Sequence, residues 1–445
     1  MLRLALPLVV SFLLRDAFGW VDMLFAAHLP GAAAQSDPAV AAIGLTGPFQ
    51  FLMIACWVGT SNALTSRIAA ALGAGQDAKI DQLLRAARRI IHALGGTFLL
   101  LATVIWFGAA HVGLEPETAR QFQIYGTVLL AGSGLTTFWS ILPDSIVKAH
   151  HDMRSVMWAG IASSILNVVL NAVFVYVFGW GIFGIALATV IGRLGGLAYA
   201  LRIAARHERR RAEARGEDPA LFARPVHTLL AMAIPSGLSF ALMALEGFAV
   251  NAFLKEQPES TSNLAAFALI DRAGRTLSMP IIALGVAMLP LAARLWGSGD
   301  VDGIRRELRT CLRITAIYGL LIVVPLTLLA SPAFARALLD QGSVDSARLA
   351  LRWLPIGVIV GSPMFLLRTT FEGMQRPLPG LAGSAARALL LSVPLGYAGL
   401  LLAPHAGLVP LEGLVIGMSV GSGLASLGMA IWIHLWFKRC GRHLP

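Results

Sequence analysis

Charged residues are scarce in this sequence. Asp, Glu, Lys and Arg make up 13% of 445 residues, which is about half the share found in soluble globular domains. Hydrophobic residues make up 57%, and the mean hydropathy is +0.73. This balance excludes an ordinary soluble domain and predicts a polytopic membrane protein. No ten-residue alternation of apolar and polar residues recurs, so the spans are expected to be α-helices.

Cysteines and catalytic motifs are also lacking. The three cysteines, Cys56, Cys311 and Cys440, lie in or beside apolar segments and suggest no disulfide framework. No nucleophile elbow, phosphate loop, Cys-x-x-Cys or His-Glu-x-x-His motif is present, so neither an enzyme nor a cofactor is expected. His150 and Asp152 flank His151 in a loop with adjacent rather than helical spacing, which disfavours a metal site.

Hydropathy predicts twelve membrane spans. They lie at roughly 3–27, 40–68, 88–110, 119–147, 155–178, 182–204, 227–254, 262–293, 308–330, 347–370, 380–402 and 411–437. The net charge of +11 collects in alternate loops, as the positive-inside rule describes. These loops are expected to meet anionic lipids rather than nucleic acid. We therefore predict a multi-pass protein of a bacterial inner (plasma) membrane with both termini cytoplasmic. No cleavable signal peptide is evident, because polar residues interrupt the first span.

The chain also repeats itself. LALPLVVSF at the first span resembles MAIPSGLSF at the seventh, and Gly73 and Arg85 match Gly297 and Arg309 at one constant offset. Six spans return a chain to its starting side, so the repeats are parallel, as in many transporters. We predict an N-terminal six-helix lobe at 1–205, a charged cytoplasmic linker at 206–225 and a C-terminal six-helix lobe at 226–445, related by a pseudo-two-fold axis along the membrane normal.

Polar residues interrupt the apolar run from Ser164 to Arg193. Asn167 and Asn171 are four residues apart and share one helix face, and Thr189 and Arg193 lie in the following segment. Side chains of this kind gain nothing from facing lipid. They are either hydrogen-bonding contacts between helices or part of a ligand site.

The first span adds ionisable residues. Asp22 has no sequence-local partner, whereas Arg15 and Asp16 are neighbours that can form a structural pair. Asp22 lies about 8 Å and Asn171 and Thr189 about 10 Å from the outer ends of their spans. These oxygen-bearing side chains therefore share a layer, where a hard cation or a proton can bind. The sequence does not choose between Na⁺ and H⁺.

The other intramembrane charges are weaker candidates for a substrate cavity. Glu246 has no local partner and can meet a cationic substrate or a proton, whereas Asp271 and Arg272 are expected to form a neighbouring structural pair. Asp144 is expected to line a cavity beside a kink at Pro143. Arg387 in the eleventh span is expected to be structural and to extend its charge toward the membrane surface.

Several blocks resemble one transporter family. They are VDMLFAAHL, GTSNALTSRIAAALGAGQD, SILNVVLNAVFVY, GIFGIALATVIGR and LIDRAGRTLSMPIIALGVA. They resemble motifs of the multidrug and toxic compound extrusion (MATE) transporters, and more closely their DinF-like branch. The resemblance covers essentially all twelve predicted spans.

This resemblance implies a twelve-helix transporter that rocks between inward- and outward-open states, driven by Na⁺ or H⁺ entry. It maps the family's cation site onto Asp22, Asn167, Asn171 and Thr189, with Asn171 standing where many relatives have Asp. The equivalence of Glu246 to a helix-seven Glu of some relatives stays open. We expect a monomeric antiporter for amphipathic, cationic organic compounds. One alternative is a flippase or exporter of a lipid-linked or endogenous metabolite, which a strongly basic central cleft would favour and which Arg15, Arg193 and Arg272 leave open. The other is a non-transporting membrane scaffold.

Overall fold

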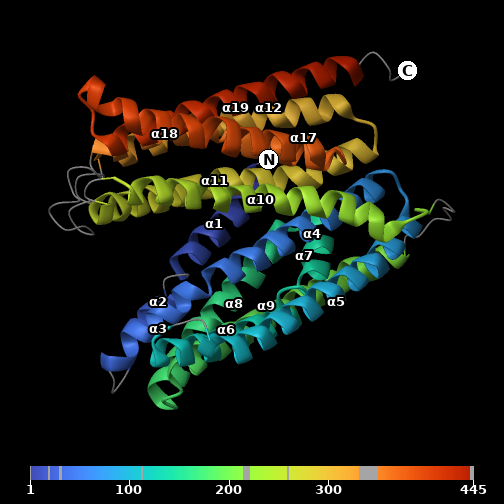
Figure 1. Ribbon diagram of the computed structural model, residues 1–445. Helices are drawn as coiled ribbons and strands as arrows, with labels where there is room; N and C mark the ends of the chain where they lie inside the picture. The colour runs from blue at the N-terminus through green and yellow to red at the C-terminus, as the bar shows by residue number, and fades with distance from the viewer. Residues whose placement is uncertain are drawn as a thin grey trace. The chain divides into compact units, whose positions relative to one another are not determined.

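The computed structural model describes residues 2–18, 21–29, 33–111, 114–213, 221–257, 260–329 and 349–440. Every regular element in these ranges is a helix (Figure 1). The chain divides into two compact units. We call Leu6–Gly237 the N-terminal unit, and Met1–Ala5 with Leu238–Pro445 the C-terminal unit. The lobe and linker ranges derived from the sequence stay a prediction.

The N-terminal unit contains most of the first ten helices. Its elements are α1 (Leu2–Phe18), α2 (Val21–Ala27), α3 (Ala33–Leu45), α4 (Gly47–Gly73), α5 (Asp77–Gly108), η1 (Ala109–His111), α6 (Pro116–Thr136), α7 (Ile141–Ala149), α8 (Met153–Ala172), η2 (Val173–Val177), α9 (Gly181–Glu213) and the first part of α10 (Pro225–Lys255). Helix α9 continues through 206–213, so this part of the expected linker is helical.

The C-terminal unit begins within α10. Its further elements are α11 (Ser260–Gly297), α12 (Val301–Tyr318), η3 (Gly319–Val323), α15 (Leu354–Gly361), α16 (Pro363–Gly373), α17 (Pro377–Ala385), η4 (Ala386–Ser392), α18 (Val393–Leu402), η5 (Ala403–Ala406) and α19 (Pro410–Cys440). The segments η2, η3 and η4 are π-helical. Such segments are wider than an α-helix and are frequent at functional sites.

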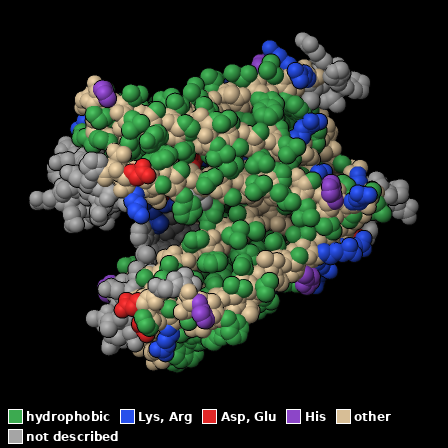
Figure 2. Space-filling view, in the orientation of Figure 1, with side chains coloured by type: hydrophobic (Ala, Val, Ile, Leu, Met, Phe, Trp, Pro, Cys, Tyr) green, Lys and Arg blue, Asp and Glu red, His purple; other side chains and the backbone are tan. Residues whose placement is uncertain are grey.

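Many of these helices can cross a membrane. Within the described ranges, nine helices are long and apolar enough, or ten if the bent pair α6–α7 counts as one span. Figure 2 shows hydrophobic side chains over most of the visible helical surface, with Lys and Arg mainly near helix ends. The second expected span, 40–68, is interrupted at Thr46, between α3 and α4, and two residues of the first, 19 and 20, lie outside the described residues. The all-helical membrane class expected from the sequence is confirmed.

The fourth expected span, 119–147, is not one straight helix. Helices α6 and α7 meet at a bend of 47°, with the turn at residues 137–140. Pro143 lies in the first turn of α7 and has no backbone N–H to continue the helix behind it. The bend therefore follows from the proline that the sequence marked as a kink.

Helices α8 and α9 approach each other closely. A Cβ atom on Gly192 would lie 2.8 Å from the Ser163 carbonyl oxygen and 3.0 Å from Asn167 Cβ, and one on Gly196 would lie 3.0 Å from the Ala159 carbonyl oxygen. Only glycine permits this approach, and small residues are the usual means by which membrane helices pack tightly. The contact brings the polar face of α8 against α9.

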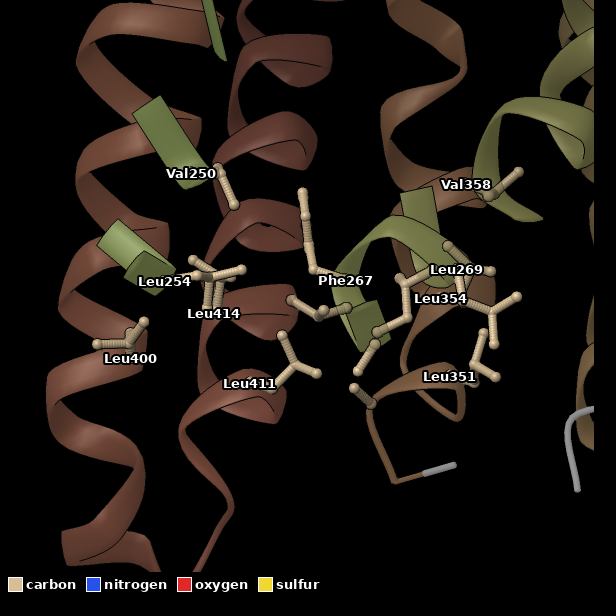
Figure 3. Close-up of a cluster of buried hydrophobic side chains, with 14 of the residues drawn as sticks. Val250, Leu254, Phe267, Leu269, Leu351, Leu354, Val358, Leu400, Leu411 and Leu414 are labelled. Carbon is tan, nitrogen blue, oxygen red and sulfur yellow. The ribbon is translucent and has the colours of Figure 1, made fainter. Parts of the chain in front are cut away.

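The C-terminal unit has its own apolar core. Val250 and Leu254 from α10 pack with Phe267 from α11, and with residues of α15, α18 and α19 (Figure 3). Within a bilayer such packing is stabilised by van der Waals contact rather than by removal from water. This core fixes α10 and α11, which carry Glu246 and Asp271.

Candidate functional site

Four polar side chains of the N-terminal unit form one hydrogen-bonded network. Asp22 on α2 accepts hydrogen bonds from Asn171 Nδ2 at 2.7 Å and from Asn167 Nδ2 at 3.4 Å through Oδ1. Its Oδ2 lies 3.0 Å from Thr189 Oγ1. Asn167 Nδ2 also donates to Thr189 Oγ1 at 3.1 Å, and Asn171 Nδ2 lies 3.4 Å from Asn167 Oδ1. The sequence placed these residues in one layer, and the structure brings them into contact.

The local fold explains how the network is assembled. Asn167 and Asn171 lie one turn apart on α8, and η2 begins two residues after Asn171. Helix α2 packs on both α8 and α9, and the Phe25 and Tyr176 rings lie 5.6 Å apart, centroid to centroid. Asp22, in the first turn of α2, is thereby held over the α8–α9 contact.

Asn171 is the most buried member. Its side chain has no exposed surface, and its carbonyl oxygen, Oδ1, has no hydrogen-bond partner among the described residues. An unpaired buried carbonyl oxygen costs free energy unless something donates to it or coordinates it. A bound cation or an added proton on Asp22 would provide such a partner.

The charge of Asp22 is met by neutral groups. Among the side chains that the structure describes, no Lys, Arg or His nitrogen forms an ion pair with its carboxylate. The side chains of Arg15 and Asp16 lie outside the described residues. Carboxylate, amide and hydroxyl oxygens are ligands suited to hard cations. The arrangement can therefore hold one proton or one small cation against a single negative charge.

Arg193 belongs to a neighbouring polar contact one turn after Thr189. Its Nη1 donates to Ser133 Oγ at 2.7 Å and lies 3.2 Å from Thr137 Oγ1, both from the region where α6 bends into α7. These contacts join Arg193, and with it α9, to the broken fourth span.

Asp144 is held in an ion pair. Its Oδ2 accepts from Lys148 Nζ at 2.6 Å and from Ser61 Oγ at 2.9 Å, and the Lys148 ammonium lies 5.2 Å from the Trp57 ring centroid. The sequence offered Asp144 as a cavity-lining residue. Its spacing from Lys148, four residues along α7, explains the pairing instead.

Two acidic residues of the C-terminal unit are paired as well. Asp271 Oδ2 lies 2.5 Å from Arg275 Nη2, four residues away on α11, and Asp271 also interacts electrostatically with the neighbouring Arg272. Adjacent helical residues point in different directions, whereas residues four apart share a face. Glu246, which has no partner nearby in the sequence, binds Arg387 at 2.6 and 3.3 Å. Arg387, expected to be structural, forms this ion pair instead of extending toward the membrane surface.

Sequence reasoning missed the charged pair on α16. Arg368 and Glu372 have 6% and 2% of their side-chain surface exposed, and Arg368 Nε lies 3.7 Å from Glu372 Oε1. The Arg368 guanidinium also lies 4.6 Å from the Phe240 ring centroid. The i,i+4 spacing was the available signal. It marks a structural pair, because both charges have a partner.

Another polar cluster lies where α5, α7 and α9 meet. It lines a cavity of ≈ 410 Å³ with His150 and His207, whose rings stack at 4.7 Å. Burial raises the pKa of Asp152, but hydrogen bonds from Ser155 and His207 outweigh it, so that its pKa lies below the usual range. Arg211 already pairs with Glu208 and with two carboxylates of α5. Among the described residues no group of three or more His, Cys, Asp or Glu is arranged to hold a metal ion.

Comparisons with known proteins agree with this architecture. The sequence profile of the MatE family matches residues 7–173 and 235–398. The chain is 26% identical over 455 residues to a probable multidrug resistance protein, NorM, of Bradyrhizobium diazoefficiens, covering 95% of this chain and 90% of that protein. It is 21% identical over 333 residues to the probable multidrug resistance protein YoeA of Bacillus subtilis, covering 72% of this chain and 68% of that protein.

A solved structure shares the fold. A crystal structure of a MATE protein in complex with MaL6 superposes with a TM-score of 0.87 at 21% identity, covering 99% of this chain and 96% of that chain. The family match extends over both halves of the chain, including Asp22, Asn167 and Asn171 in the first and Glu246 in the second. The chain is therefore a transporter rather than an enzyme, and it belongs to the MATE family of multidrug transporters.

Proposed function

We propose that this chain is a cation-coupled antiporter that exports amphipathic, cationic organic compounds by alternating access, in the manner of the DinF-like branch. The coupling ion, H⁺ or Na⁺, binds at Asp22, with Asn167, Asn171 and Thr189 as neutral oxygen partners. Binding of the ion favours one arrangement of the helices. In that arrangement the protein binds the exported compound less tightly and releases it. The chain acts as a monomer in a bacterial plasma membrane with both termini cytoplasmic.

One observation supports this proposal most strongly. Asp22 contacts three neutral polar side chains on α8 and α9, and the fully buried Asn171 keeps a carbonyl oxygen without a partner among the described residues. A purely structural contact would use both ends of that amide, because unpaired buried polar atoms are costly. The network is therefore better suited to an exchangeable cation than to permanent helix adhesion.

Among the side chains that the structure describes, one carboxylate, Asp22, serves this site. Because Asn171 is neutral, a proton or a Na⁺ ion on Asp22 brings the described network to zero net charge. A second bound cation would leave uncompensated positive charge in a low-dielectric environment, which is strongly unfavourable. One coupling ion per transport cycle follows from this composition.

Transport by purified protein in proteoliposomes tests the proposal. A fluorescent organic cation is followed under a Na⁺ gradient alone and under a pH gradient alone. The wild type is expected to respond to one of these gradients, and Asp22→Asn is expected to lose at least about 90% of that response, because the replacement cannot bind a proton and coordinates Na⁺ weakly.

Glu117→Gln provides the matched control. It makes the same carboxylate-to-amide change at an exposed pair with Arg120 and is expected to keep full transport. Folding of each variant is checked by the elution profile and thermal denaturation midpoint in detergent. If folded Asp22→Asn transports like the wild type, the assignment is wrong. If the wild type responds to neither gradient, the metabolite-flippase alternative gains support.

A further inference from the structure

The C-terminal unit contains a buried carboxylate whose counter-charge is part of the chain. Glu246 on α10 is 7% exposed. Arg387 on the π-helical segment η4 reaches it with two nitrogens, Nη2 at 2.6 Å from Oε2 and Nη1 at 3.3 Å from Oε1. This forked geometry is the strongest form of carboxylate recognition by arginine.

The surrounding charges are balanced in the same way. On α16, Arg368 is paired with Glu372. On α11, Asp271 is paired with Arg275 and also interacts electrostatically with Glu246. Each described carboxylate around Glu246 thus has its own arginine. An additional cation would find no uncompensated negative charge among these described residues, in contrast to the single charge at Asp22.

The space around Arg387 is limited but not fully filled. A small cavity of ≈ 20 Å³ is lined in part by Arg368 and Arg387. It is about large enough for one water molecule. Ser384 lines it, and Ser422 Oγ lies 3.5 Å from Arg387 Nη1. Removing the Arg387 side chain would add its volume to this cavity and leave Glu246 without its counter-charge, with room for water.

We propose that Arg387 is a tethered cation that occupies a second cation site at Glu246. The guanidinium takes the place that a proton or Na⁺ would otherwise hold, and Ser422 Oγ lies within reach of its Nη1. Because Arg387 cannot leave, the C-terminal unit binds no exchangeable ion. The number of coupling ions is thereby set by a residue far in sequence from Asp22. The blocked ion site at Glu246 stands independently of the proposed function, whereas its effect on the number of coupling ions rests on that function.

Ion binding by the purified full-length chain in detergent tests this directly. All measurements use an Asp22→Asn background, so that the result does not depend on the role of Asp22. Arg387→Ala is expected to gain binding of one Na⁺ per chain by calorimetry, or an infrared carboxylic-acid band on acidification. Adding Glu246→Gln to this variant is expected to abolish the gain. Arg387→Lys, which keeps a tethered positive charge, is expected to show none.

A folded Arg387→Ala variant without any gained ion or carboxylic-acid signal would overturn the proposal. A second comparison covers the case in which this variant does not fold. The double variant Glu246→Gln/Arg387→Ala removes both charges, which is better tolerated than removing one. With Asp22 intact, it should bind as many cations as the wild type. One cation fewer per chain would show that Glu246 already carries an exchangeable ion, and the proposal would be wrong.

Discussion

Two membrane carboxylates of this transporter, the half-buried Asp22 and the buried Glu246, are stabilised in opposite ways. Asp22 in the N-terminal unit receives hydrogen bonds from amide and hydroxyl groups, whereas Glu246 in the C-terminal unit is held by two nitrogens of one guanidinium. Neutral hydrogen-bond donors stabilise a carboxylate without cancelling its negative charge, so a mobile cation can still bind it. A guanidinium neutralises the charge permanently. The difference teaches that a membrane carboxylate can bind a coupling ion only when no fixed positive side chain already neutralises it.

The largest difference in stability is expected between two equivalent substitutions. Glu246→Gln leaves the Arg387 charge buried without its partner and should cost about 3–5 kcal/mol. Asp22→Asn leaves only neutral groups behind and should cost much less. Thermal denaturation midpoints in detergent compare the two. Equal midpoints for both variants would contradict the distinction between an exchangeable and a tethered counter-charge.

A second carboxylate at the first site should sharpen the contrast. Asn171→Asp places a further negative charge beside Asp22, in contact with its Oδ1. We expect at least about tenfold tighter Na⁺ binding or proton binding at higher pH, because like charges in contact favour cation uptake. Calorimetry and pH titration measure this. Thr327→Ser, at a buried hydroxyl of the C-terminal unit, is the control and should change neither.

The smallest expected effect separates coupling from helix stability. Asp152 caps α8, accepting from the Ser155 backbone N–H at 3.2 Å. Asp152→Ala should lower stability by about 1 kcal/mol without altering ion-driven transport. Because the pKa of Asp152 is lowered on folding, its contribution is present above the pKa of the unfolded chain and is lost as pH falls through the folded value. Denaturation midpoints of the variant and wild type should therefore converge in strong acid. Loss of ion-driven transport in Asp152→Ala would contradict the view that Asp152 stabilises α8 without taking part in ion coupling.

The sequence was sufficient for the features that depend on local spacing. Apolar segments predicted the membrane helices, and the four-residue spacing of Asn167 and Asn171 predicted their common face. Helix geometry fixes such spacing within a few residues, so the residue order alone is enough to predict it. Depth arithmetic placed Asp22 and Thr189 only in the same layer, and the family resemblance grouped the four residues as one site. In the structure, hydrogen bonds join all four.

Relations between distant segments could not be predicted in this way. Glu246 and Arg387 lie on different helices, and no periodicity links their positions. The salt bridge between Asp271 and Arg275, one turn apart on α11, was also not predicted. The π-helical segments η2, η3 and η4 contain no proline, and their sequences did not distinguish them from α-helix. Such features arise only once the helices have packed together.

One count tests the central claim, that the chain holds a single exchangeable cation and that Asp22 binds it. The measurement is the number of Na⁺ ions or protons bound per purified chain, by calorimetry and pH-dependent proton uptake, in the wild type, Asp22→Asn and Glu246→Gln/Arg387→Ala. We predict that the wild type and the double variant bind one cation each, and that Asp22→Asn loses it. Unchanged binding by Asp22→Asn would contradict the account.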